Sequence, residues 1–145
     1  PLCDWSSDVC SSDLLVDRWQ ICRFTPPSSV NIEVGVAHMG HGGYDAPNDK
    51  KAYSVVIDFI TPETETSIHY FWGMARKFNP QDMALTASIR EGQGKIFTED
   101  LEMLERQQKN LLAHPNRSVL KLNIDAGGVQ SRKVLERWIA QEQAT

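Results

Sequence analysis

Asp100 is the acidic residue whose position in this sequence is hardest to explain by structure alone. The sequence predicts a helix from about Lys95 to Ala113, in which Phe97 and several leucines recur at helical spacing. On a wheel of 3.6 residues per turn, Asp100 lies ~60° from Phe97, inside the apolar stripe. An ionised carboxylate on a core-facing stripe is costly unless a cation, a metal or strong hydrogen-bond donors meet it.

Two interpretations of Asp100 remain open from the residues alone. In the first, Thr98 caps the helix and Asp100 complements the helix dipole from the first turn. In the second, Asp100 is a metal ligand or a catalytic carboxylate in an internal cavity. The two differ in whether the carboxylate turns outward to water or inward to a cavity.

Asp58 raises the same question on a strand. It shares one strand face with Val56 and Ile60, so the carboxylate needs a partner. A salt bridge to Arg76 or Lys77 is the simplest structural expectation, and a functional role is the alternative.

The other motifs carry less information. His38 and His41 have the spacing of a metal-ligand pair, but they lie among glycines, and we expect them to be solvated. The segment Gly92–Lys95 precedes the predicted helix without the spacing of a phosphate-binding loop. Composition and spacing alone therefore leave one suspicious acid and no complete catalytic motif.

The elements that must position these residues follow from periodicity. Val30–Val36 alternates as a strand does, and two β-rich runs, Tyr53–Ile60 and Ser67–Arg76, predict an antiparallel pair. Both runs are apolar on both faces, which predicts a sheet with two covered faces. The helix near residues 95–113 and a last helix at about Val129–Gln143 follow. Strands first and helices afterwards indicate the α+β class.

The first fourteen residues are expected not to be native. Asp4–Leu14 is the translation of a common short-read sequencing adapter, and scars of this kind are excluded before a fold is argued. The exclusion removes three aspartates, so the formal net charge of −4 becomes about −1, which argues against a nucleic-acid or anionic-membrane partner. Of three cysteines only Cys22 is left, so a disulfide framework is not expected. With no apolar run of about 18 residues, a cytoplasmic protein is the default expectation.

Several separated blocks of the sequence resemble the C-terminal catalytic part of vanillate O-demethylase oxygenase subunits, a family of Rieske non-haem iron oxygenases. The blocks, in their order along the chain, are Asp17–Phe24, Ile32–His38, Asp58–Glu63, Tyr70–Arg76, Gly92–Asp100 and Leu122–Arg132. The resemblance is specific because many blocks agree in both sequence and order. Residues 15–145 are therefore expected to be the C-terminal part of an oxygenase catalytic domain.

The resemblance implies a helix-grip fold, here a truncated antiparallel sheet packed on a long C-terminal helix. It also implies a mononuclear Fe(II) held by two histidines and one aspartate. In this family the aspartate belongs to the acid pair that opens the long helix, a position that matches Asp100. The two histidines, and the ligands of a [2Fe-2S] Rieske cluster, are expected upstream of Val16. These 145 residues alone are therefore expected to be inactive and to bind no iron tightly.

The resemblance further implies partners and a reaction. A reductase would supply electrons, and the complete subunit would form a homotrimer in which electrons pass between neighbouring subunits. With O₂, vanillate or a similar methoxybenzoate would be hydroxylated on its methyl group and would collapse to a phenol plus formaldehyde. No nucleic-acid or membrane partner is implied.

Substrate contacts carried over from a related demethylase fall on Asn31 and Asp58. Asn31 keeps the residue type found there, Asp58 replaces a histidine, and a third contact, a tryptophan, is Glu91 here. Two alternatives stay open: a metal-free helix-grip module that binds a hydrophobic ligand, and a Rieske oxygenase with a different aromatic substrate or ring hydroxylation.

Overall fold

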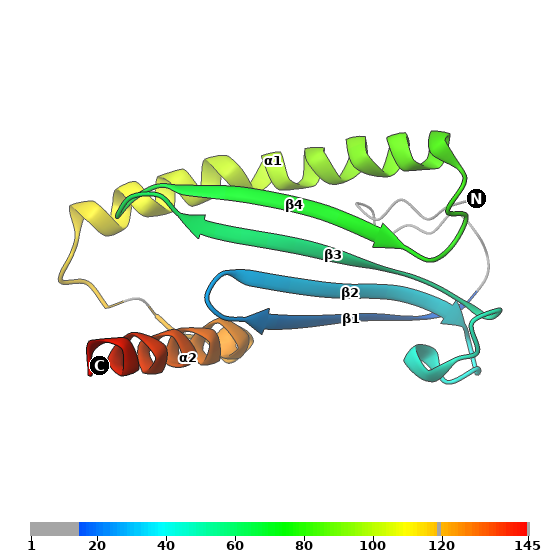
Figure 1. Cartoon of the computed structure of the whole chain (residues 1–145), viewed down its shortest axis with the longest axis horizontal. Coiled ribbons are helices and arrows are strands. Elements are labelled where there is room, and N and C mark those ends of the chain that lie inside the picture. The colour runs from blue at the N-terminus through cyan, green and yellow to red at the C-terminus, as the bar shows by residue number, and fades with distance from the viewer. Residues whose placement is uncertain (1–14, 119, 145) are drawn as a thin grey trace.

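A four-stranded antiparallel sheet followed by two helices makes up the computed structural model, which describes residues 15–118 and 120–144. The segment for which the sequence predicts a sequencing artefact lies outside the described residues. The strands pair in chain order, each with the next, so the sheet is a simple meander (Figure 1). Their bounds are Val16–Thr25 (β1), Ser29–His38 (β2), Lys51–Pro62 (β3) and Ile68–Arg76 (β4).

The connections follow local turn chemistry. A short turn at Pro26-Pro27, whose peptide bond is cis, joins β1 to β2. The longer β2–β3 connection contains a 3-10 turn at Gly43–Asp45 and places Gly40, Gly42 and Gly43 at positive φ, which glycine adopts without a Cβ penalty. The predicted strand at 30–36 and the predicted antiparallel pair are confirmed. β1 was not predicted from periodicity.

The long helix α1 (Met83–Ala113) begins twelve residues before the expected start at Lys95. Asp82 is its N-cap: the carboxylate accepts a hydrogen bond from the backbone N–H of Leu85 at 2.9 Å. Gly92 and Gly94 lie inside the helix although each glycine costs about 1 kcal/mol there relative to alanine. No clash requires glycine at either position, since a Cβ on Gly94 would lie 3.8 Å from the Trp72 ring, an ordinary contact distance, and a Cβ on Gly92 would meet nothing within 4 Å.

The shorter helix α2 (Ala126–Gln143) also begins earlier than predicted and includes Gly127 and Gly128. A 3-10 turn (η2, Asn123–Asp125) precedes it, in which the Asp125 carboxylate accepts a hydrogen bond from the backbone N–H of Leu122 at 2.8 Å. For both helices, sequence periodicity predicted a start after two glycines, whereas the helix begins before these glycines and includes them. Among the described residues, no helix is long and apolar enough to span a membrane.

α1 runs along the edge strand β4 and contacts one face of the sheet (Figure 1). On that face Ser54, Val56 and Asp58 of β3 are buried. The opposite face of β3 is only half-buried, and Phe59 and Phe71 on it are 48% and 60% exposed. The expectation of two covered faces is therefore wrong for the described part of the chain, since the helix covers one.

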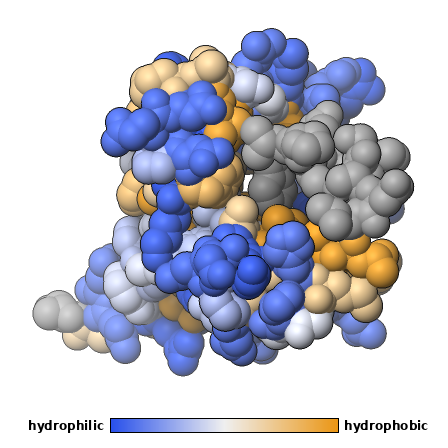
Figure 2. Space-filling model, turned by 90° about the vertical axis from the view of Figure 1, so that its right-hand side faces the viewer, coloured by the Kyte–Doolittle hydropathy of each residue, from blue (hydrophilic) through white to orange (hydrophobic). Residues whose placement is uncertain are grey.

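Apolar residues of the helices are also exposed. Leu101 and Leu104 of α1, expected to face the core, are 53% and 59% exposed. The end view in Figure 2 shows apolar surface (orange) among hydrophilic groups (blue). The predicted α+β class is confirmed, with the sheet packed on the long helix that carries Asp100.

Candidate functional site

Asp58 is buried, at 4% exposure, and is hydrogen-bonded to a tyrosine on the next strand. Register places Asp58 opposite Trp72 and Ile60 opposite Tyr70, so Asp58 and Tyr70 are diagonal neighbours on one face. The Tyr70 hydroxyl donates to Asp58 Oδ1 at 2.9 Å. The predicted salt bridge to Arg76 or Lys77 is therefore wrong. The β3–β4 register explains why, since it pairs Asp58 with Trp72 and places both cations further along β4.

The two cations lie further along β4. Arg76 is opposite Ser54 and turns toward α1, and Lys77 lies 5.9 Å from the Tyr53 ring, on the other face of β3. Neither forms a salt bridge with Asp58, whose hydrogen-bond partner is the neutral Tyr70.

Both members of the Asp58–Tyr70 pair have shifted pKa values. Burial raises the pKa of Asp58 above its ordinary value, and the hydrogen bond from Tyr70 lowers it in part. Burial also raises the pKa of Tyr70, followed by its hydrogen bond to Asp58 and by the negative charges of Asp58 and Asp100. The tyrosine therefore stays protonated and remains a donor throughout the physiological range.

Phe97 attaches α1 to this part of the sheet. Its ring lies 5.6 Å from Tyr70, edge to face, and 5.2 Å from Trp72, tilted by 60°. Each aromatic pair is worth about 0.5–1.5 kcal/mol beyond the buried area. The cluster of Tyr70, Trp72 and Phe97 fixes which side of α1 faces β4.

Asp100 follows Phe97 by three residues, a little less than one helical turn, and so lies on a neighbouring part of the sheet-facing side. Its charge acts on the Tyr70 hydroxyl, which places the two groups near one another. Asp100 is exposed and has no hydrogen bond or ion pair with another residue that the structure describes. A carboxylate with free lone pairs beside a buried polar pair is chemically able to bind a cation.

The first interpretation of Asp100 is wrong about the cap and the helix dipole, but Asp100 is exposed, so the described residues do not form the internal cavity that the second interpretation expects around it. Thr98 does not cap a helix: its hydroxyl donates to the carbonyl of Gly94 at 2.8 Å, four residues back in an uninterrupted helix. Asp100 is the eighteenth residue of α1, far from the N-terminus and its positive dipole end. The expectation that the acid pair opens the long helix is wrong for the same reason.

Asn31 is not brought together with Asp58. It lies opposite Ile57, so its side chain belongs to the face of the sheet away from α1. Glu91, the third aligned position, is on α1 in an ion pair with Lys95 at 2.8 Å. Asp58 and Asp100 thus share one side of the molecule, and Asn31 lies on the other.

His38 and His41 lie at the end of β2 and in the following loop, both exposed, with ring centroids 6.4 Å apart. They are not near a third ligand: in the described part of the chain no group of three or more His, Cys, Asp or Glu side chains could hold a metal ion. Asp100 could supply one ligand, and the described residues do not complete a set around it.

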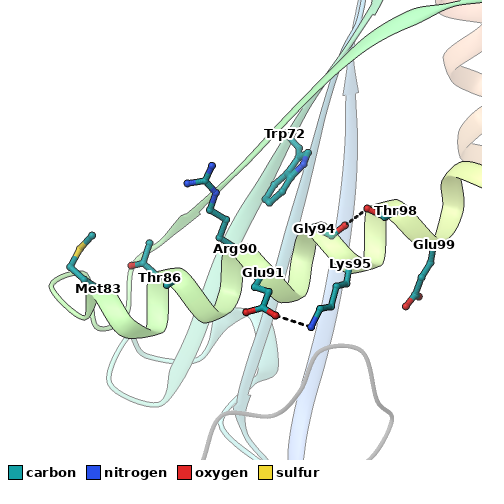
Figure 3. A pocket seen from close by; sticks show the side chains of 10 residues that line it. Trp72, Met83, Thr86, Arg90, Glu91, Gly94, Lys95, Thr98 and Glu99 are labelled. Carbon is teal, nitrogen blue, oxygen red and sulfur yellow. Dashed lines mark hydrogen bonds and ion pairs between the residues drawn. The ribbon is translucent and has the colours of Figure 1, made fainter.

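Two open cavities lie along α1, a larger one of about 1020 Å³ that is lined mainly by α1 together with Trp72, and a smaller one of about 640 Å³ between β4 and the first half of α1. They share Trp72, Thr86 and Arg90. Figure 3 shows Arg90 and Trp72 on the same side of α1, while the Glu91–Lys95 pair and Glu99 extend from the other side. Asp58 and Asp100 are not among the residues that line these two cavities, although Thr98 and Glu99 of the larger one adjoin Asp100.

Similarity to known proteins identifies the family of this chain. A family model described as vanillate O-demethylase oxygenase C-terminal domain matches residues 4–141. The chain belongs to this family. It is 72% identical over 134 residues to the vanillate O-demethylase oxygenase subunit of Pseudomonas sp. (strain ATCC 19151), and 70% identical over 133 residues to that of Pseudomonas sp. (strain HR199 / DSM 7063). Each alignment covers 92% of this chain, but only 41% and 38% of the relatives.

The fold comparison agrees. The crystal structure of apo dicamba monooxygenase superimposes with a TM-score of 0.78 at 25% identity, over 92% of this chain and 41% of that one. The resemblance stated from the sequence blocks is therefore confirmed, and so is the fold class.

Sequence reasoning missed the residues that join the site. Tyr70 and Phe97 were treated as part of a β-rich run and of an apolar stripe, and only the β3–β4 register shows that Tyr70 meets Asp58. A tyrosine on the facing strand of a buried acid is a usable signal, provided that the turn length fixes the register.

Proposed function

We propose that this chain forms part of the terminal oxygenase of a Rieske non-haem iron monooxygenase that O-demethylates vanillate or a similar methoxybenzoate to a phenol plus formaldehyde. The observation that carries the proposal is 72% identity to a vanillate O-demethylase oxygenase subunit over 92% of this chain. A single mismatched pocket residue can change specificity, so the substrate is the part that most needs a direct test.

Asp100 is the proposed carboxylate ligand of a mononuclear Fe(II). Its support is the free, solvent-accessible carboxylate on the sheet-facing side of α1, close enough to Tyr70 for its charge to act there. Two histidines and the ligands of a [2Fe-2S] Rieske cluster would come from outside the described residues. When bound, the iron would supply the activation of O₂. These 145 residues alone are accordingly proposed to bind no iron tightly and to be inactive.

Asp58 and Tyr70 are proposed to form the polar wall of the substrate site. The support is their shared face with α1 and the buried carboxylate, of which Tyr70 satisfies one oxygen. The other carboxylate oxygen of Asp58 could accept a hydrogen bond from a substrate group. Loss of Asp58 would then raise KM for such a substrate more than for an analogue without the donor.

Asn31 remains a proposed substrate contact on sequence grounds, and its position on the opposite face makes it separable from Asp58. Asn31→Ala in a complete oxygenase should uncouple O₂ uptake from demethylation if it touches the substrate. Unchanged coupling and substrate affinity would remove Asn31 from the site.

The proposed partners are a reductase that supplies electrons, O₂, an aromatic acid and two further copies of the subunit in a homotrimer. The reductase is supported by relatives that are oxygenase subunits or components, of which this chain spans 41% and 36%, and the other partners are proposed from the family resemblance alone.

A metal-free module that binds a hydrophobic ligand is the second candidate. It is favoured by the larger cavity of about 1020 Å³, whose wall includes Trp72 and Met83. It would bind aromatic compounds with no need of iron or reductase.

One experiment separates the candidates. These residues replace the matching 41% of the Pseudomonas subunit, and the full-length protein is incubated with reductase, NADH and vanillate. We expect formaldehyde and O₂ consumption in a ratio near one to one. A ring-hydroxylated product, or vanillate binding with no turnover by an iron-replete protein, would contradict the proposal.

A further inference from the structure

Tyr70 differs from the two other tyrosines of the chain in what its hydroxyl contacts. The Tyr70 hydroxyl donates to the Asp58 carboxylate at 2.9 Å, whereas the hydroxyls of Tyr44 and Tyr53 form no hydrogen bond in the described part of the chain. Exposure does not explain the contrast, since Tyr70 and Tyr44 are 41% and 42% exposed. Tyr70 is therefore the tyrosine whose hydroxyl has a base of the protein beside it.

The charges near the three tyrosines also differ in sign. The Lys51 amine lies 5.6 Å from the centre of the Tyr44 ring and 5.8 Å from that of Tyr53, and the Lys77 amine lies 5.9 Å from the Tyr53 ring. The charges that act on the Tyr70 hydroxyl are negative and belong to Asp58 and Asp100. A positive neighbour opposes the loss of an electron from a ring, and a negative neighbour favours it.

The Asp58 carboxylate is also placed to accept a proton. Removal of one electron from a tyrosine ring turns its hydroxyl into a strong acid, so the proton needs an acceptor at once. A carboxylate oxygen at hydrogen-bond distance accepts it without waiting for a base from solvent. Burial raises the pKa of Asp58, which makes this carboxylate a stronger base than an exposed aspartate. Geometry and charge thus both favour oxidation of Tyr70.

We propose that Tyr70 and Asp58 form a proton-coupled redox site, in which Tyr70 gives one electron to a one-electron oxidant and its hydroxyl proton to Asp58 Oδ1. The O–H bond of Tyr70 breaks and an O–H bond forms on Asp58, while the oxidant is reduced by one electron. The products are a neutral tyrosyl radical and a neutral carboxylic acid, and return of one electron reverses both transfers. The role of the pair in a complete oxygenase, as an electron donor near Asp100, rests on the proposed function, whereas the redox site itself requires no iron.

Laser flash–quench oxidation of the 145-residue chain tests the site. Tris(bipyridine)ruthenium(III), generated by the flash, is the oxidant, and the tyrosyl radical is followed by its optical absorbance and its EPR spectrum. Two proteins with a single tyrosine are compared: one keeps Tyr70 (Tyr44→Phe with Tyr53→Phe), and the matched control keeps the equally exposed Tyr44 (Tyr53→Phe with Tyr70→Phe). At pH 7 in dilute buffer, we expect the protein that keeps Tyr70 to form the radical about a hundredfold faster, the lower end of what a positioned base contributes.

Asp58→Asn in the protein that keeps Tyr70 leaves an oxygen acceptor but removes the base, and it should lower the rate to that of the control. Because this variant could fail to fold, the buffer dependence is a second measurement that needs no change at Asp58. The Tyr70 rate should be independent of the concentration of buffer base, whereas the Tyr44 rate should rise with it. Equal rates in the two single-tyrosine proteins, an unchanged rate in folded Asp58→Asn, a buffer-dependent Tyr70 rate, or a radical found only on tryptophan would each overturn the proposal.

Discussion

Replacing Tyr70 with phenylalanine isolates the interaction on which the buried Asp58 depends. The substitution removes one hydroxyl, which donates to Asp58 Oδ1 at 2.9 Å, and it keeps the ring that packs on Phe97. Asp58 is 4% exposed, so water cannot readily replace the donor. Leaving a buried acceptor unsatisfied costs about 1–3 kcal/mol, and more when the group is charged. We expect Tyr70→Phe to lower the free energy of unfolding at pH 7 by about 2 kcal/mol.

The effect should depend on pH with a definite sign. The folded-state pKa of Asp58 is raised above its ordinary value of 3.8, so the folded state favours the protonated acid. The stability that this provides is fully present below pH 3.8 and is lost as pH rises through the raised pKa. Because Tyr70 lowers that pKa, the variant loses more stability on the alkaline side. Near pH 4 we expect a loss of only about 0.5–1.5 kcal/mol, that of a neutral hydrogen bond.

Urea unfolding of the 145-residue chain at pH 4, 5.5 and 7 measures this difference. Tyr53→Phe, on the opposite face of β3, is the matched control. The Tyr53 hydroxyl makes no hydrogen bond with another described residue, so its removal should change stability little at any pH. Asp58→Asn should abolish the pH dependence of the Tyr70→Phe effect. An equal loss at pH 4 and pH 7, or none at either, would refute the account of the pair.

Two further predictions concern the scaffold. Gly35→Ala should cost about 1–3 kcal/mol in thermal or urea unfolding, because the new Cβ would overlap the Trp19 ring, whereas Gly73→Ala, which meets nothing within 4 Å, should not destabilise through a clash. Asp82→Ala should cost about 1 kcal/mol, because the backbone N–H of Leu85 loses its cap; no change in stability would show that the cap is replaced by water.

The sequence was sufficient for β2, β3, β4 and the fold class, because period-two alternation and the later helical spacing are local signals, but it did not predict β1. The start of α1 could not be predicted from local signals. Gly92 and Gly94 indicate a break, yet α1, capped by Asp82, continues through both glycines. The low helix propensity of two glycines does not end a helix of 31 residues.

Part of the candidate site could likewise be predicted from local signals, and the rest depends on how the strands pair. Asp100 could be singled out from its wheel position, although the expected cap by Thr98 was wrong. The partner of Asp58 depends on a register set by the β3–β4 connection, and a one-residue slip would have moved Tyr70 to the other face. The separation of Asn31 from Asp58 is a consequence of the same alternation on β2 and β3.

The iron content of an Asp100→Asn variant tests the central claim most directly. The variant is made in the full-length chimera with the Pseudomonas subunit, beside a Glu99→Gln control that changes the adjacent exposed acid. We predict that Asp100→Asn loses its mononuclear iron and its formaldehyde production while the absorbance of the [2Fe-2S] cluster stays unchanged, and that Glu99→Gln keeps all three. An Asp100→Asn protein that retains stoichiometric mononuclear iron and full demethylation would contradict the assignment of this carboxylate as the ligand.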